Sequence, residues 1–112
     1  MKNSEFIVGK VPITKEEVRA ISLAKLDLSG ACNFLDIGSG TGSVTVEAAL
    51  KNKDIRVTSI EKDQAALDLT RLNIKKFERA NPDLINNNSR LRKMTIIYVE
   101  YPQIICYLHT IY

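Results

Sequence analysis

The sequence contains few of the residues from which metal sites and disulfide frameworks are built. Its 112 residues include two cysteines, Cys32 and Cys106, and one histidine, His109. The cysteines lie far apart without metal-ligand spacing, so we predict free thiols in a reducing cytoplasm. No cluster of cysteine and acidic residues accompanies His109, which we expect to pack or lie on the surface rather than act as a catalytic base. The sequence therefore predicts no metal site.

The sequence also lacks a long apolar run and a strong charge of one sign. No stretch approaches the ~18 apolar residues of a membrane span, and no signal peptide opens the chain. The net charge is only +3, from 16 basic and 13 acidic residues, and a basic stripe with interleaved aromatic side chains is missing. We expect a cytoplasmic protein that has no membrane or nucleic-acid partner. Its length and its apolar content of 45% suit one small domain with a modest core.

The most informative stretch is a glycine-rich turn. Asp36 closes a short apolar run, and glycines then alternate with small hydroxyl residues. These turn residues are Gly38, Ser39, Gly40, Thr41 and Gly42. The segment 43–50 that follows can form a helix. A strand, a tight turn and a helix N-terminus together hold nucleotide-like cofactors, because glycine permits positive φ and close backbone approach while the helix presents free N–H groups.

A second acid lies at the distance expected for a ribose-binding residue. The β-branched run 55–61 ends at Glu61, which is 23 residues after Gly38, close to the ~20 residues of dinucleotide-binding units. In a parallel βαβ unit the ends of both strands meet at one edge of the sheet. We therefore predict that Glu61 accepts hydrogen bonds from the ribose hydroxyls of a cofactor; a solvated acid at a strand end is the alternative.

The region before the turn predicts a capped helix. Thr14 and Glu17 match a capping box, and a helix to about Leu28 follows. Its apolar residues at helical spacing predict the buried face. These are Val18, Ile21, Ala24 and Leu28. From spacing alone, Thr14 is interpreted as a helix cap.

The remaining elements predict an α/β fold with parallel strands. Strand 31–37 is almost continuously apolar, as buried parallel strands are, and Asp63 is expected to cap a helix that runs to about residue 77 or 79. Its predicted inward face comprises Ala66, Leu67, Thr70, Ile74 and Phe77. We predict a domain over residues 1–80 and an atypical tail over 81–112, with strand 94–99 and a poorly defined strand 104–112.

The turn and the second acid resemble a known family. The pattern of Asp36, Gly38, Gly40 and Gly42, followed by Glu61, resembles motif I and the next acid of class I methyltransferases dependent on S-adenosyl-L-methionine. Segments 11–20 and 42–49 are similar to one branch, the decarboxylating precorrin or cobalt-precorrin C15-methyltransferases of cobalamin biosynthesis. The resemblance covers about residues 4–79.

The resemblance implies a Rossmann-like class I methyltransferase fold, of which the chain holds the N-terminal half only. It implies S-adenosyl-L-methionine as cofactor, a tetrapyrrole (precorrin) substrate methylated at carbon 15 with loss of carbon dioxide, and a homotetramer. It identifies no catalytic base. The cofactor-binding residues that it implies are Thr14, Asp36, Gly38, Ser39, Gly40, Thr41, Gly42 and Glu61.

Two alternatives remain at this point. Family members continue with further strands, and nothing after Arg79 resembles those strands. We therefore expect a truncated or frame-disrupted relative. One alternative is that the chain is a non-catalytic fragment. The other is an NAD(P)-binding Rossmann domain, although the third glycine of a dinucleotide fingerprint would fall at Ser43.

Overall fold

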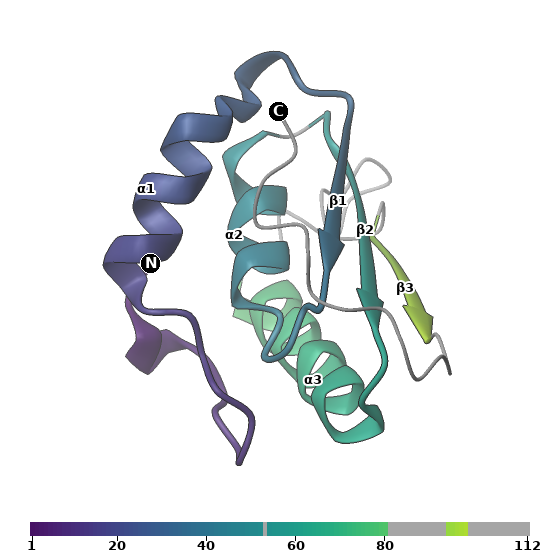
Figure 1. The fold of residues 1–112 in the computed structure, drawn as a ribbon. Helices are drawn as coiled ribbons and strands as arrows, with labels where there is room; N and C mark the ends of the chain where they lie inside the picture. The colour runs from purple at the N-terminus through teal and green to yellow at the C-terminus, as the bar shows by residue number, and fades with distance from the viewer. Residues whose placement is uncertain (53, 81–93, 99–112) are drawn as a thin grey trace.

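The computed structural model describes residues 1–52 and 54–80, and the backbone of 94–98 (Figure 1). In chain order the elements are the 3-10 helix η1 (Asn3–Glu5), α1 (Glu16–Leu26), the 3-10 helix η2 (Leu28–Gly30), β1 (Asn33–Ile37), α2 (Ser43–Lys51), β2 (Arg56–Glu61), α3 (Gln64–Ala80) and β3 (Met94–Tyr98). The predicted strand over 104–112, Cys106 and His109 lie outside the described residues. Cys32 is a free, exposed cysteine.

The strands form a parallel sheet in the order β1-β2-β3, which confirms the predicted parallel arrangement. In the register of β1 and β2, Asp36 lies beside Ser59 and Ile37 beside Ile60. Both strands therefore end at the same edge of the sheet. This alignment places the turn after β1 next to Glu61 at the end of β2.

The core lies between the sheet and the helices. Figure 1 shows α2 between α1 and the sheet, with α3 packed beside α2. Val57 of β2 and Val46 of α2 are fully buried in this layer. The side chains of β2 alternate, with positions 57, 59 and 61 buried and 56, 58 and 60 more exposed. One face of the sheet thus carries the packing against the helices.

The prediction that strand 31–37 is a buried strand holds for only part of it. Within β1, Leu35 is 53% exposed and Asn33 is also exposed, while Phe34 and Asp36 are half-buried. The difference arises because successive side chains of a strand point to opposite faces. The helix-facing side of β1 carries Phe34 and Asp36, and the opposite side carries Leu35.

Helix α1 also differs from its prediction. Its N-cap is Lys15, without a side-chain cap hydrogen bond, so Thr14 does not form the predicted capping box. The predicted buried face is largely exposed, with Val18 at 52% and Ile21 at 61%, whereas Arg19 and Leu23 are buried. Ala24 is exposed as well. The helix ends at Leu26, because Asp27 adopts a left-handed conformation with φ of 43°; the buried Leu28 belongs to η2.

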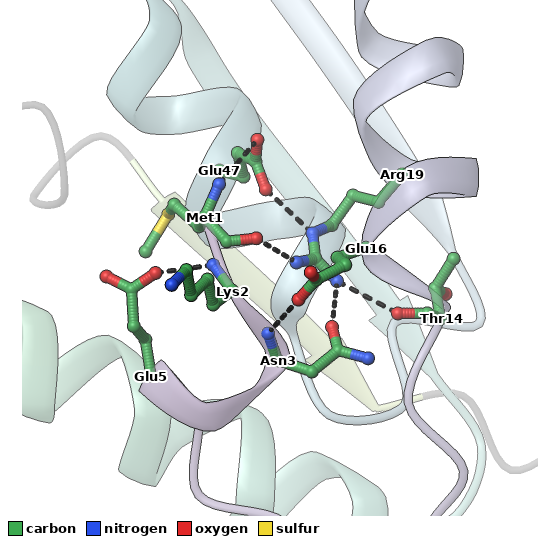
Figure 2. A network of polar contacts seen from close by, with 8 residues as sticks. All are labelled: Met1, Lys2, Asn3, Glu5, Thr14, Glu16, Arg19 and Glu47. Atoms are coloured by element: carbon green, nitrogen blue, oxygen red, sulfur yellow. Dashed lines mark hydrogen bonds and ion pairs between the residues drawn. The ribbon is translucent and has the colours of Figure 1, made fainter.

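A buried guanidinium explains the orientation of α1 (Figure 2). Arg19 donates from Nε to Glu47 Oε2 of α2 at 2.7 Å. Its Nη1 donates to Asn3 Oδ1 and to the carbonyl oxygen of Thr14, both at 2.9 Å. Its Nη2 donates to the carbonyl oxygen of Met1 at 2.7 Å. A buried charge is tolerated only with such partners, so these bonds fix which side of α1 faces α2.

Helix α3 agrees with the sequence prediction. Asp63 Oδ1 accepts a hydrogen bond from the N–H of Ala66 at 2.8 Å, as an N-cap does. All five residues of the predicted inward face are buried. They are Ala66, Leu67, Thr70, Ile74 and Phe77. The buried Asn73 was not among the predicted inward residues.

Candidate functional site at the glycine turn

The glycine turn joins β1 to α2 and adopts a backbone that side chains disfavour. Gly38, Gly40 and Gly42 have φ values of 80°, 57° and 77°, all in the left-handed region that glycine enters without steric cost. At Gly42 a Cβ atom would lie 2.9 Å from Thr70 Cγ2 and 3.1 Å from Thr70 Cα. The structure therefore confirms the predicted need for glycine in this turn.

Backbone hydrogen bonds fasten the turn to the end of β2. The N–H groups of Gly38 and Ser39 donate to the carbonyl oxygen of Ile60 at 2.7 and 3.3 Å. Gly42 N–H donates to Ser39 O at 2.8 Å, which closes the turn. Gly42 is also the N-cap of α2, and no side chain makes a cap hydrogen bond there. Since the first N–H groups of a helix have no partner within it, the start of α2 suits an anionic group.

Glu61 lies where the sequence predicted, at the same edge as the turn, and it is only 7% exposed. Its Oε2 accepts a hydrogen bond from the N–H of Gly40 at 2.8 Å. Its Oε1 accepts from the N–H groups of Lys62 and Asp63 at 2.8 and 3.0 Å. The carboxylate is therefore held by backbone donors on two sides, unlike a solvated acid at a strand end. Because a carboxylate has about four acceptor positions, it retains capacity for a ligand hydroxyl.

Asp36 faces the start of α2. Its Oδ2 accepts a hydrogen bond from the Thr45 hydroxyl, and this hydroxyl also lies 3.4 Å from the Ser59 hydroxyl of β2. Thr45 and Ser59 are fully buried. The first acid of the motif thus links the end of β1 to the first turn of α2, and in doing so supports the glycine turn from within the fold.

The N-terminal segment passes over the turn. A Cβ atom on Gly40 would lie 3.7 Å from Pro12 O and 3.7 Å from Val11 Cγ1. Thr14 is half-buried, and its carbonyl oxygen accepts the bond from Arg19. The segment that carries Thr14 is therefore brought to the glycine turn.

Sequence reasoning missed how α3 supports the turn. Thr70 Oγ1 donates to Gly40 O at 3.0 Å and lies 3.2 Å from Ser39 Oγ. Asn73 Nδ2 donates to Thr41 O at 2.8 Å. Helical spacing alone predicts Thr70 only as a core residue. The available signal was the pair of polar residues three positions apart on the inward face of an amphipathic helix, where polar groups require partners.

The described residues contain neither a metal-ligand cluster nor a long apolar helix. Within residues 1–52 and 54–80, no group of three or more histidine, cysteine or acidic side chains could hold a metal ion. No helix in this part of the chain has the length and apolar character needed to span a membrane.

Comparison with known proteins places the chain in a family. Residues 6–97 match the family model of the precorrin methyltransferase domain. A relative from Salmonella typhimurium, named cobalt-precorrin-6B C(15)-methyltransferase (decarboxylating), is 46% identical over 86 residues, or 76% of this chain and 45% of the relative. The chain thus spans somewhat less than half the length of that relative.

Solved structures agree with this assignment. The crystal structure of precorrin-6y C5,15-methyltransferase from Geobacter metallireducens has a TM-score of 0.71 and 32% identity, covering 88% of this chain and 46% of that chain. A putative protein-L-isoaspartate O-methyltransferase from Plasmodium falciparum, solved with S-adenosyl-L-homocysteine, has a TM-score of 0.57 and 25% identity, covering 84% of this chain and 43% of that chain. The fold is that of class I methyltransferases, and the expected family is confirmed. The family match extends to residue 97, beyond the stretch on which the resemblance rested. The chain belongs to the precorrin methyltransferase domain family.

Proposed function

We propose that this chain binds S-adenosyl-L-methionine at the glycine turn and forms the cofactor-binding half of a decarboxylating methyltransferase of cobalamin biosynthesis. The observation that carries this proposal is the hydrogen bond between the Glu61 carboxylate and the Gly40 N–H. It holds a ribose-type acceptor directly beside a turn built for close approach of a ligand. The bound S-adenosyl-L-homocysteine of the Plasmodium falciparum structure supports the choice of cofactor.

The residues of the turn suit the separate parts of this cofactor. The methionine portion would lie along Gly38, Ser39, Gly40, Thr41 and Gly42, with its carboxylate near the start of α2, where no side chain caps the helix. A ribose hydroxyl would bind Glu61 at the acceptor position that its three backbone donors leave. Thr14 would contribute from the segment that covers the turn, and Asp36 would act by holding the turn to α2.

We propose a cobalt-precorrin as the methyl acceptor, because the Salmonella typhimurium relative is named for that substrate. When bound, S-adenosyl-L-methionine supplies an electrophilic methyl group. This chain would contribute binding and orientation of that group, and such positioning accounts for much of the acceleration of a two-substrate reaction. By family resemblance the protein would work in the cytoplasm as a homotetramer, without nucleic-acid or membrane partners.

The dinucleotide-binding alternative receives less support. The third glycine of that fingerprint would stand at position 43. Ser43 there is the first residue of α2 and is 2% exposed. The turn instead repeats glycine at every second position, as the methyltransferase motif does.

Calorimetric titration with S-adenosyl-L-homocysteine tests the proposal. Wild-type chain is expected to bind, and Glu61→Gln to weaken binding by about tenfold or more, because it removes a charged acceptor. Asp68→Asn is a matched control: it also removes one negative charge, but from a side chain that is 58% exposed and bonded to Arg71.

The control is expected to change the dissociation constant by less than about twofold. NADH, titrated in parallel, is expected to give no binding heat. A chain that is folded by circular dichroism but does not bind S-adenosyl-L-homocysteine would refute the proposed function. Equal weakening by both variants would overturn the role of Glu61 in holding the ribose.

A further inference from the structure

We propose that Asn73 and Thr70 of α3 are positioning residues that join the N-terminal segment to the glycine turn and thereby set the affinity for the cofactor. The inference rests on the proposed cofactor binding. It assigns to two buried polar side chains a role that neither the motif nor the family resemblance identified.

The amide of Asn73 uses its acceptor and its donor group for backbone partners from two separate segments. Its Oδ1 accepts from Ile7 N–H at 2.6 Å, and its Nδ2 donates to Ile7 O at 3.0 Å. The same Nδ2 donates to Thr41 O at 2.8 Å. Asn73 is fully buried, whereas Ile7 is 38% exposed. The amide therefore fastens the backbone at Ile7 to the turn, and an aspartate of the same shape could not donate these bonds.

Thr70 holds the adjoining part of the turn. Its hydroxyl donates to Gly40 O at 3.0 Å, and its Cγ2 would stand 2.9 Å from a Cβ on Gly42. In a trans peptide the C=O and the following N–H point in opposite directions. With Gly40 O directed toward α3, the N–H of Thr41 is directed away from α3. Thr70 therefore determines the direction of a backbone donor in the turn.

The segment held by Asn73 also forms a wall of the site. A Cβ atom on Gly9 would lie 3.9 Å from Leu69 Cδ2 of α3. A Cβ atom on Gly40 would lie 3.7 Å from Pro12 O. The chain after Ile7 thus follows α3 and then crosses the turn. A change at Asn73 would displace both the turn and the segment that covers it.

The chain offers a matched control in Asn52. Its Nδ2 donates to backbone carbonyl oxygens as that of Asn73 does, to Leu28 O at 2.8 Å and Ala31 O at 3.0 Å, but at the C-terminal end of α2. Asn73→Asp is expected to weaken S-adenosyl-L-homocysteine binding by about tenfold or more, since two donated bonds are replaced by repulsion. Asn52→Asp is expected to lower the midpoint of thermal unfolding while changing the dissociation constant by less than about twofold.

A second pair of variants decides the question if Asn73→Asp does not fold. Thr70→Val keeps the shape and removes the hydroxyl, and is expected to weaken binding by about fivefold or more; Thr70→Ser, which restores the hydroxyl, is expected to recover most of the affinity. Hydrogen exchange of the ligand-free chain supplies an independent readout. The amides at positions 40–42 are expected to exchange faster in Thr70→Val than in Thr70→Ser.

The outcomes separate this inference from the function on which it rests. If the folded wild-type chain does not bind S-adenosyl-L-homocysteine, the proposed function fails. If wild type binds and the folded Thr70→Val and Asn73→Asp variants bind equally well, this inference alone is overturned. It is also overturned if Asn52→Asp weakens binding as much as Asn73→Asp.

Discussion

The carboxylate of Glu61 and the backbone N–H of Gly40 are joined by a 2.8 Å hydrogen bond between residues 21 positions apart. The acid at the end of β2 is thus part of the structure of the turn after β1. With its other oxygen bonded to Lys62 and Asp63 N–H groups, Glu61 also shapes the entry into α3. The Glu61 side chain therefore stabilises both the turn between β1 and α2 and the connection between β2 and α3.

Glu61→Gln is expected to destabilise the ligand-free chain by about 1–3 kcal/mol, because the amide nitrogen would face a backbone donor in a buried position. Urea unfolding measures the change. Asp68→Asn, at an exposed site, is expected to stay within about 0.5 kcal/mol of wild type. Equal stability of Glu61→Gln and wild type would show that the bond to Gly40 does not contribute to the fold.

Arg19→Met is expected to destabilise the chain by about 3 kcal/mol, because it leaves the buried Glu47 with only the N-terminal ammonium of Met1, at 3.4 Å, as its charged partner. The Glu47 side chain is only 8% exposed, and its ion pair with Arg19 is 2.7 Å long. Adding Glu47→Gln to Arg19→Met is expected to recover part of this loss in the same urea measurement. A double variant that is less stable than Arg19→Met would contradict this account.

Leu23→Ala is expected to cost about 2–5 kcal/mol, as for other buried leucines, whereas Ile21→Ala is expected to cost no more than about 0.5 kcal/mol. Leu23 is 1% exposed and Ile21 is 61% exposed, although both belong to α1. Thermal or urea unfolding of the two variants tests the orientation of this helix. The reverse order of stability would mean that the face predicted from apolar spacing is the buried one.

Gly42→Ala is expected to cost about 1–3 kcal/mol or more, because the residue has φ of 77° and its Cβ would meet Thr70 at 2.9 Å. Gly30→Ala is the control, since a Cβ at Gly30 would have no atom within 4 Å. That control is expected to be neutral within about 0.5 kcal/mol in the same unfolding experiment. Comparable losses at the two glycines would argue against the close packing of the turn on α3.

The sequence predicted the parts of the structure that depend on local patterns. Glu61 lies beside the turn, as predicted, because the ends of parallel strands in a βαβ unit meet at one edge of the sheet. The turn glycines and the cap and inward face of α3 also agree with the structure, because they follow from backbone preference and helical spacing. The orientation of α1 was not predictable in this way. Its inward residues are Leu23 and Arg19, and Arg19 faces inward because it pairs with Glu47, 28 positions later. The amide of Asn73 likewise acts through Ile7, 66 positions away. A periodic pattern in one sequence can show that such a polar residue faces inward, but it does not identify the distant partner.

The contact between Gly42 and Thr70 has a consequence for the evolution of the family. Glycine is required at position 42 because a Cβ there would meet Thr70 at 2.9 Å, whereas a Cβ at Gly40 would have 3.7 Å to its nearest neighbours. A descendant that no longer used the cofactor would still be selected to keep Gly42, because the φ of 77° and the 3.1 Å approach of Thr70 Cα are properties of the fold and not of the cofactor. Position 40 would drift first, to residues such as asparagine that tolerate the left-handed conformation. Retention of Gly40, rather than of Gly42, would therefore be the better mark of a lineage in which this site still works.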